Sequence, residues 1–206
     1  MLLPGDPGRA LRLAQQVVDA PKMLNHHRGL WGYTGTAADG EPLTIQSTGL
    51  GGPSTAIVVE ELIALGARRL VRVGTCGALG ALELGSLVIA ETVRAEDGAS
   101  RALGATGALA PDGDLLAALR SAAGDAAVGE VVSVDLYSDP GAWPGAVAVD
   151  LSAAAVLAVA ARHGARAAAV FAVSDVLAGE RRRIEVEALE GAEVELGRVA
   201  AAALGA

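Results

Sequence analysis

The chain has 206 residues, of which 52% are hydrophobic and 19% charged, and its formal net charge is -8. This composition indicates a folded domain with a sizeable core and excludes a disordered chain. The net negative charge disfavours nucleic acid as a partner, so any bound anion must be held by a local group of arginines.

Cys76 is the single cysteine, which excludes an internal disulfide and a Cys-rich metal site and is compatible with a reducing compartment. The first residues, M-L-L-P-G-D-P, lack the charged start and long apolar run of a signal peptide. The longest apolar runs are rich in Ala and are broken by Arg, His or Gly, unlike a membrane span. We therefore expect a cytoplasmic protein with no membrane or nucleic-acid partner, no metal and no cofactor.

The first chemical candidates lie near the start of the chain. Residues 5–9 read G-D-P-G-R and predict a turn, and residues 10–18 predict a helix, so Arg9 falls near the start of that helix. A helix N-terminus preceded by Gly5 can form an anion-binding corner. A solvated arginine after a turn is the alternative interpretation of the same residues.

Residues 25–36, N-H-H-R-G-L-W-G-Y-T-G-T, mix polar, aromatic and glycine residues and predict a loop that leads into an edge hairpin. Arg28 and the two histidines are its chemical candidates. For His26 and His27 a surface position is favoured over a catalytic role.

The next stretch predicts a strand, a helix and another strand. Residues 43–48 alternate as a strand, residues 49–53 form a glycine-rich turn, and residues 54–65 are expected to be helical. Ser54 can cap this helix and Gly66 can end it. A strand, helix, strand unit indicates a three-layer α/β/α architecture.

Residues 70–79, L-V-R-V-G-T-C-G-A-L, carry the strongest functional signal. The valines alternate with Arg72 as in a strand, and residues 74–77 are expected to end that strand in a tight turn. A buried arginine is costly unless an anion meets it. Thr75 offers a hydroxyl, and the neighbouring glycines leave backbone N–H groups open. The stretch therefore predicts an anion site at the carboxyl end of a strand.

The remaining pattern continues the α/β alternation without an internal repeat or a linker, so one domain over residues 1–206 is expected. Strands are predicted at 86–93, 131–134, 146–149 and 167–173, helices at 114–123, 152–162 and from about 185, and an irregular connection at 96–110. Tyr137, in a polar turn at 135–140, can stack on a ligand or cover the core. Asp175, after a strand, is either a helix N-cap or an acid at the ligand-binding edge of the sheet.

Six motifs together resemble a known family, the hexameric nucleoside phosphorylases, which are the bacterial purine nucleoside and uridine phosphorylases. The motifs are G-D-P-G-R at 5–9, N-H-H-R-G-L-W-G-Y-T-G at 25–35, G-L-G-G-P-S at 49–54, R-V-G-T-C-G at 72–77, D-G-A-S at 97–100 and V-S-D at 173–175. The resemblance implies a mixed sheet flanked by helices. It also implies a reaction in which inorganic phosphate displaces a base from C1 of a nucleoside sugar.

The resemblance also implies roles for individual residues. Phosphate would be held by Gly5, Arg9, Arg72 and Thr75, and by Arg28 from a neighbouring subunit, which implies a dimer-based hexamer. The nucleoside would lie against Cys76, Gly77, Tyr137, Leu151 and Ser152. Asp175 matches the acid that protonates the leaving base at N7 in the purine enzymes, and such an acid needs a site that disfavours its carboxylate form. Because the uridine enzymes lack an acid at this place, Asp175 favours a purine substrate.

Departures from the family concern the sugar and the region after Asp175. Where the family has E-M-E, this chain has Asp150, Leu151 and Ser152, and a serine cannot make the paired carboxylate contact to the ribose hydroxyls. The family's helper arginine has no exact match after Asp175. The arginines at 181–183 lie nearby, but closer to the acid than the family pattern implies, and a solvated charge cluster at a helix start is the preferred interpretation. The leading hypothesis is a purine-type nucleoside phosphorylase with altered sugar selectivity. Uridine-type phosphorolysis and a phosphorylase-like binding protein without turnover are the alternatives.

Overall fold

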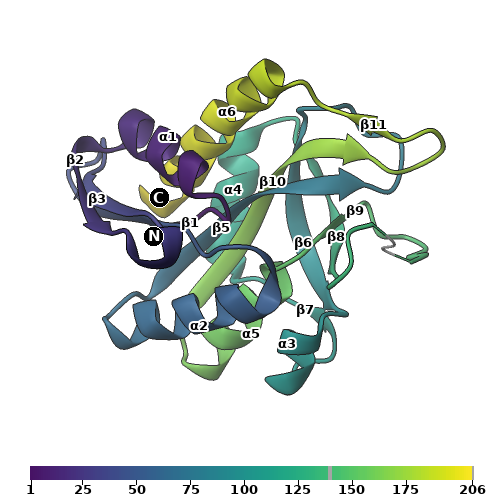
Figure 1. The fold of residues 1–206 in the computed structure, drawn as a ribbon, viewed down its shortest axis with the longest axis horizontal. Helices are drawn as coiled ribbons and strands as arrows, with labels where there is room; N and C mark the ends of the chain where they lie inside the picture. The colour runs from purple at the N-terminus through teal and green to yellow at the C-terminus, as the bar shows by residue number, and fades with distance from the viewer. Residues whose placement is uncertain (139–140, 206) are drawn as a thin grey trace.

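The computed structural model describes residues 1–138 and 141–205, which form an α/β fold around one mixed sheet with helices on both faces (Figure 1). Its strands are β1 (Leu2–Leu3), β2 (Asp19–Asn25), β3 (Gly32–Thr36), β4 (Pro42–Gln46), β5 (Arg69–Ala78), β6 (Leu87–Ala95), β7 (Gly107–Leu109), β8 (Ala127–Ser133), β9 (Ala148–Asp150), β10 (Arg166–Val176) and β11 (Arg182–Arg183). Its helices are α1 (Pro7–Val17), α2 (Gly51–Ala64), α3 (Gly98–Ala102), α4 (Gly113–Ala123), α5 (Ala153–Arg162), α6 (Val186–Gly205) and the short 3-10 helix η1 (His27–Gly29).

The sheet curls into a partly closed barrel. The strands β5, β10, β6, β8 and β9 pair in that sequence, and β9 pairs back onto β5. On the other side of β5 the sheet continues through β1, β4 and β3 to the edge strand β2. The predicted three-layer fold with a central mixed sheet is thus confirmed, whereas the expectation of one domain over residues 1–206 stays a prediction.

Alternation along the central strands divides the apolar residues between two cores. The first core lies between the sheet and helices α2 and α5, and the second lies between the sheet and helices α1, α4 and α6 (Figure 1). On β5, Leu70 and Cys76 belong to the first core, while Val71 and Val73 belong to the second. A strand whose successive side chains point to opposite faces can supply both cores only when both faces are covered.

The predicted turn at residues 74–77 is wrong, because β5 continues as a strand through these residues to Ala78. The two glycines serve close packing instead. A Cβ atom on Gly77 would lie 2.6 Å from the Tyr137 hydroxyl, and one on Gly74 would lie 3.1 Å from the ring of Phe171. The glycines in this strand therefore mark places where side chains approach the backbone closely.

The start of α2 also differs from the prediction. The helix begins at Gly51, and the Ser54 hydroxyl donates a hydrogen bond to the Thr48 carbonyl at 2.7 Å instead of capping the helix. The predicted end is confirmed. Gly66 has a φ of +108°, and the Ala67 amide bonds back to the Leu62 carbonyl, which is the glycine-dependent helix ending called a Schellman motif.

Short elements account for most of the other differences. Residues 96–110, expected to be an irregular connection, contain α3 and the short strand β7, and residues 19–25 form the edge strand β2 that pairs with β3. The exposed residues of β2 lack the alternation that predicts a strand, and pairing with β3 supplies the missing stability. Within the described part of the chain, none of the helices has both the length and the apolar composition that a membrane crossing requires.

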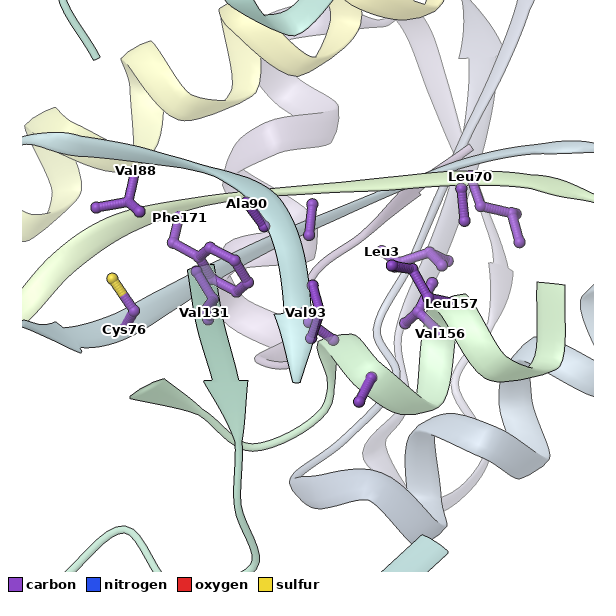
Figure 2. Close-up of a cluster of buried hydrophobic side chains, with 14 of the residues drawn as sticks. Leu3, Leu70, Cys76, Val88, Ala90, Val93, Val131, Val156, Leu157 and Phe171 are labelled. Atoms are coloured by element: carbon purple, nitrogen blue, oxygen red, sulfur yellow. The ribbon is translucent and has the colours of Figure 1, made fainter. Parts of the chain in front are cut away.

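Phe171, on β10, is the largest of the fully buried side chains. Figure 2 shows it in the first core among Cys76, Ala90 and Val131. Since the chain has only one phenylalanine and builds its core mainly from Ala, Val and Leu, its neighbours have little volume with which to fill a gap left there.

We expect Phe171→Ala to lower the free energy of unfolding by about 3–5 kcal/mol, through lost burial and a residual cavity. Urea denaturation measures this change. Leu65→Ala is the control, because Leu65 is 85% exposed and its truncation should change stability by no more than about 0.5 kcal/mol. Equal effects of the two substitutions would contradict the assignment of Phe171 to the centre of the core.

Candidate functional site

A cavity of about 610 Å³ opens at the carboxyl ends of β5 and β10, where the α1 and α2 N-termini also meet. Most of the residues predicted from the sequence to form the site line this cavity. They are Gly5, Arg9, Arg28, Arg72, Thr75, Tyr137, Leu151, Ser152 and Asp175. The structure therefore brings together residues that lie up to 170 positions apart in the sequence.

One end of the cavity is cationic. The Arg9 and Arg72 side chains line it although both residues are almost completely buried, at 6% and 7% exposed. The Arg72 guanidinium donates to the Leu3 carbonyl at 3.0 Å, and its Nε has no partner among the described residues. Burial lowers the pKa of Arg72 to about 10, while the nearby Asp150 carboxylate opposes and Arg9 reinforces this shift. An anion in the cavity would offset the mutual repulsion of the two guanidinium groups.

Gly5 and the start of α1 complete this end. Asp6 caps α1 by accepting the Arg9 amide at 2.7 Å, and Pro7 is the first helical residue. A Cβ atom on Gly5 would lie 3.0 Å from the Gly49 carbonyl and 3.3 Å from the Arg72 guanidinium. Only glycine therefore leaves the space between that carbonyl and the guanidinium open.

Asp175 lines the cavity and is 4% exposed. It pairs with Gly77, five residues further along β5 than Arg72, and therefore lies at the other end. Its carboxylate accepts hydrogen bonds from Arg181 Nη2 at 3.0 Å, Tyr137 Oη at 3.1 Å and Ser174 Oγ at 2.9 Å. Three converging donors suit a carboxylate, which differs from the expected site that disfavours this form. The alternative of a helix N-cap is wrong, because Asp175 lies within β10 and pairs with β11.

Arg181 was missed as a site residue. It was interpreted as part of a solvated cluster at a helix start, but its guanidinium pairs with Asp175 and lies 5.5 Å from the centre of the Tyr137 ring. Residues 182–183 form a strand instead of a helix start.

The burial of the Tyr137 phenol, together with the Asp175 carboxylate, raises the pKa of Tyr137 above its usual range, so that the hydroxyl remains a donor. The last two residues of the predicted turn around Tyr137, 139 and 140, lie outside the described residues.

Asp150, Leu151 and Ser152 also line the cavity. Asp150 is 2% exposed and accepts hydrogen bonds from Ser133 Oγ and from the amides of Ser152 and Ala153. Burial raises the pKa of Asp150, although Arg72 and these hydrogen bonds oppose the rise. The Ser152 hydroxyl is fully buried and has no hydrogen-bond partner among the described residues. It is thus a polar group beside the cavity that a ligand could satisfy.

Two of the predicted nucleoside contacts do not line the cavity. Cys76 is 1% exposed and belongs to the first core, and burial raises the pKa of its thiol well above the usual range. This placement supports packing and not nucleophilic chemistry. Gly77 acts indirectly, since its missing side chain leaves room for the Tyr137 hydroxyl.

The chemical candidates of the loop at 25–36 lie in two different places. His26 and His27 border a different hollow, with Met23, Leu24 and Asn25, as the preferred surface interpretation predicts. Arg28 is exposed, has a φ of +55° and lines the cavity of its own chain. Among the described residues, no group of three His, Cys, Asp or Glu side chains gathers as a metal site would require.

Glu193 is a second residue that the sequence analysis missed. This acid of α6 is 2% exposed and accepts the Arg9 Nε at 2.7 Å. Its spacing to the buried residues Leu196, Gly197 and Ala200 is that of one helix face, so the helical period could have identified a buried acid. Its partner could not be identified in this way, because Arg9 lies 184 residues away.

The chain is similar to known proteins over most of its length. A family model described as the phosphorylase superfamily matches residues 1–139. The purine nucleoside phosphorylase DeoD-type of Geobacillus kaustophilus is 36% identical over 201 residues, which cover 90% of this chain and 84% of the relative. The guanosine phosphorylase of Halorubrum lacusprofundi is 37% identical, over 88% of this chain and 80% of the relative. The DeoD-type enzyme of Bacillus subtilis is 34% identical, over 90% and 85%.

Proposed function

The chain belongs to the phosphorylase superfamily, and from this we propose that it is a purine nucleoside phosphorylase, which uses inorganic phosphate to cleave the N-glycosidic bond and releases a free base and a pentose 1-phosphate. The observation that carries the proposal is one cavity with two buried arginines at one end and a buried acid at the other. The sequence-based prediction of a purine-type pentosyltransferase agrees with the relatives named above.

Phosphate is proposed to bind at the cationic end. Guanidinium groups match the geometry and charge of a phosphate dianion, and Arg9 and Arg72 both line the cavity. Thr75 offers a hydroxyl, and the absence of a side chain at Gly5 leaves room for the anion beside Arg72. The buried Arg9 and Arg72 guanidinium groups repel each other when the cavity holds no anion. Bound phosphate offsets this repulsion, which favours phosphate binding.

The reaction needs a nucleophile placed beneath the sugar. As the glycosidic bond breaks, C1 of the sugar gains positive charge, and a phosphate held close to C1 both stabilises this charge and attacks the carbon. The base leaves with its electron pair, and a proton delivered to it prevents an unfavourable anion. Asp175, at the opposite end from the arginines, is the residue we assign to this proton transfer.

The contacts of Asp175 suit the state after the proton has been given to the base. In that state the side chain is a carboxylate, and Arg181, Tyr137 and Ser174 all direct donors to it. Stabilising the carboxylate lowers the energy of the products of proton transfer and so favours departure of the base. Before each turnover Asp175 has to take up a proton, and its pair with Arg181, whose side chain is half exposed, can open as it does so.

Sugar recognition is proposed to be relaxed. A carboxylate that binds two neighbouring hydroxyls must have free acceptor positions, but Asp150 already accepts from Ser133, Ser152 and Ala153. The Ser152 hydroxyl is left as a single group that can donate to or accept from one sugar hydroxyl. The 2'-hydroxyl of ribose should therefore contribute little to binding.

Arg28 is assigned to a site shared between subunits. It is exposed and follows the exposed edge strand β2, and it also lines the cavity of its own chain. In a dimer-based hexamer such a residue can contact phosphate in a neighbouring copy, while Arg9 and Arg72 act within their own chain.

A phosphate-dependent assay of base release tests the proposed function. We expect release of hypoxanthine from inosine and of guanine from guanosine only in the presence of phosphate, with kcat/KM for the 2'-deoxy forms within about threefold of the ribo forms because each hydroxyl meets at most one neutral partner. Uridine is the control substrate and should not be cleaved. Binding of phosphate without cleavage of any purine nucleoside would favour a binding protein instead.

We expect Asp175→Asn to lower kcat for inosine by about 10²–10⁴-fold, the usual contribution of a positioned general acid. The KM for phosphate should be nearly unchanged, because the arginines lie at the other end of the cavity. Steady-state kinetics with each substrate varied in turn measure both quantities. Unchanged turnover in this variant would remove Asp175 from the mechanism.

Light scattering at assay concentrations tests the shared site. We expect an oligomer of at least two copies. The Arg28→Met substitution should raise the KM for phosphate and leave the oligomer intact, since loss of one charged contact to phosphate costs about 1.5–3 kcal/mol. A fully active monomer would contradict the assignment of Arg28 to a neighbouring site.

A further inference from the structure

We propose that Glu193, on the C-terminal helix α6, is a positioning residue that holds the Arg9 guanidinium in the orientation that binds phosphate. This inference rests on the proposed function, which places phosphate beside Arg9. Glu193 lies outside residues 1–139, the part of the chain that the family model matches. Among the described residues it does not line the cavity, so any effect on phosphate must pass through the arginine.

Glu193 is a buried acid whose two oxygens are both used. Oε1 accepts from Arg9 Nε at 2.7 Å, and Oε2 accepts from Arg12 Nε at 2.9 Å and from Arg12 Nη2. Its side chain is 2% exposed and that of Arg9 is 8% exposed. A buried carboxylate and guanidinium at this distance form a charge-assisted hydrogen bond that solvent does not screen.

The contact at Nε fixes the whole guanidinium plane of Arg9. Since the guanidinium group is rigid and planar, holding Nε sets the directions of both terminal nitrogens. Those two nitrogens have no hydrogen-bond partner among the described residues, and Arg9 lines the cavity. The carboxylate therefore holds one edge of the group and leaves the other edge for an anion.

Close packing of two helices brings Glu193 within reach. Gly197 lies one turn after Glu193, and a Cβ atom there would lie 2.3 Å from the Leu13 side chain on α1. The small residue lets α6 approach α1, the helix that carries Arg9 and Arg12. The position of the phosphate arginine thus depends on the far end of the sequence.

Arg12 allows the positioning role to be separated from a structural one. It shares Glu193 with Arg9, but its side chain is 35% exposed and it is absent from the described residues that line the cavity. Removing Arg12 would leave the contact between Glu193 and Arg9 in place. Removing Glu193 would release Arg9, whereas Arg12 would keep Glu190 at 3.9 Å.

Charge and orientation predict opposite effects of removing the carboxylate. If Glu193 acted only through its negative charge, its neutralisation would strengthen phosphate binding, because one repulsive charge would be lost. If it orients Arg9, neutralisation would weaken phosphate binding, because the guanidinium could adopt other rotamers. Whether phosphate binding becomes tighter or weaker therefore decides between a charge effect and an orienting role of Glu193.

Titration calorimetry with inorganic phosphate, together with the KM values for phosphate and inosine, tests the proposal. We expect Glu193→Gln and Glu193→Asp to weaken phosphate binding by about tenfold, in the range of coupling between contacting residues, and to change the KM for inosine less than twofold. Glu190→Gln is the matched control, since Glu190 is on the same helix but half exposed and 3.9 Å from Arg12. Arg12→Met should likewise leave phosphate binding within twofold of the unmodified protein.

A double-mutant cycle completes the test. In an Arg9→Met background, where the guanidinium is absent, Glu193→Gln should cause no further change in phosphate binding. Additive losses, or unchanged or tighter phosphate binding in folded Glu193→Gln, would overturn the proposal. If Glu193→Gln fails to fold by circular dichroism, Glu193→Asp, which keeps the charge but shortens the side chain, decides the question. Calorimetry needs no turnover, so the proposal can fail or succeed independently of the phosphorolysis assay.

Discussion

The site depends on an irregularity in the pairing of β5 with β10. The two strands run parallel with a constant register from Arg166 to Val173, and the register then shifts between Val173 and Asp175. Paired residues on adjacent strands point to the same face of a sheet. Without the shift Asp175 would pair with Ala78 and point into the first core, but with it Asp175 pairs with Gly77 and lines the cavity. One extra residue in β10 therefore converts a core position into a site position.

Nearby carboxylates explain how the protein tolerates two buried arginines at the cavity. Each buried arginine has a carboxylate of its own chain nearby, since Glu193 pairs with Arg9 and Asp150 lies close enough to Arg72 to oppose the lowering of its pKa. Neither carboxylate uses all the donors of its arginine, because a guanidinium carries five N–H groups. The protein can thus fold with two buried cations and still retain donors for an anion in the cavity.

Most of the residues that the sequence singled out line one cavity, whereas the local structure around them was predicted less well. Strand alternation around Arg72 and the glycines after it predicted an anion site, and Arg72 does line a cavity. The same glycines were interpreted as a turn, because glycine in a strand and glycine in a turn have the same local signature. Arg181 and Glu193 were missed because their roles come from residues that folding brings close. Even the nearby pair of Arg181 and Asp175 needs the reversal of the chain between β10 and β11. The register shift at Ser174 leaves no pattern in composition or periodicity.

Burial divides the ion pairs of the site into a fixed set and an adjustable one. The Arg9 pair with Glu193 is buried on both sides, so breaking it would leave an uncompensated buried charge. In the pair of Asp175 with Arg181 the arginine side chain is 52% exposed, so water can replace the carboxylate as its partner at small cost. In the proposed reaction this difference has a use. The phosphate donors stay in place through the cycle, while Arg181 can leave Asp175 when it takes up a proton and return when the carboxylate forms. In that reaction, preorganisation would be concentrated at Arg9 and Arg72, and freedom to move at Asp175 and Arg181.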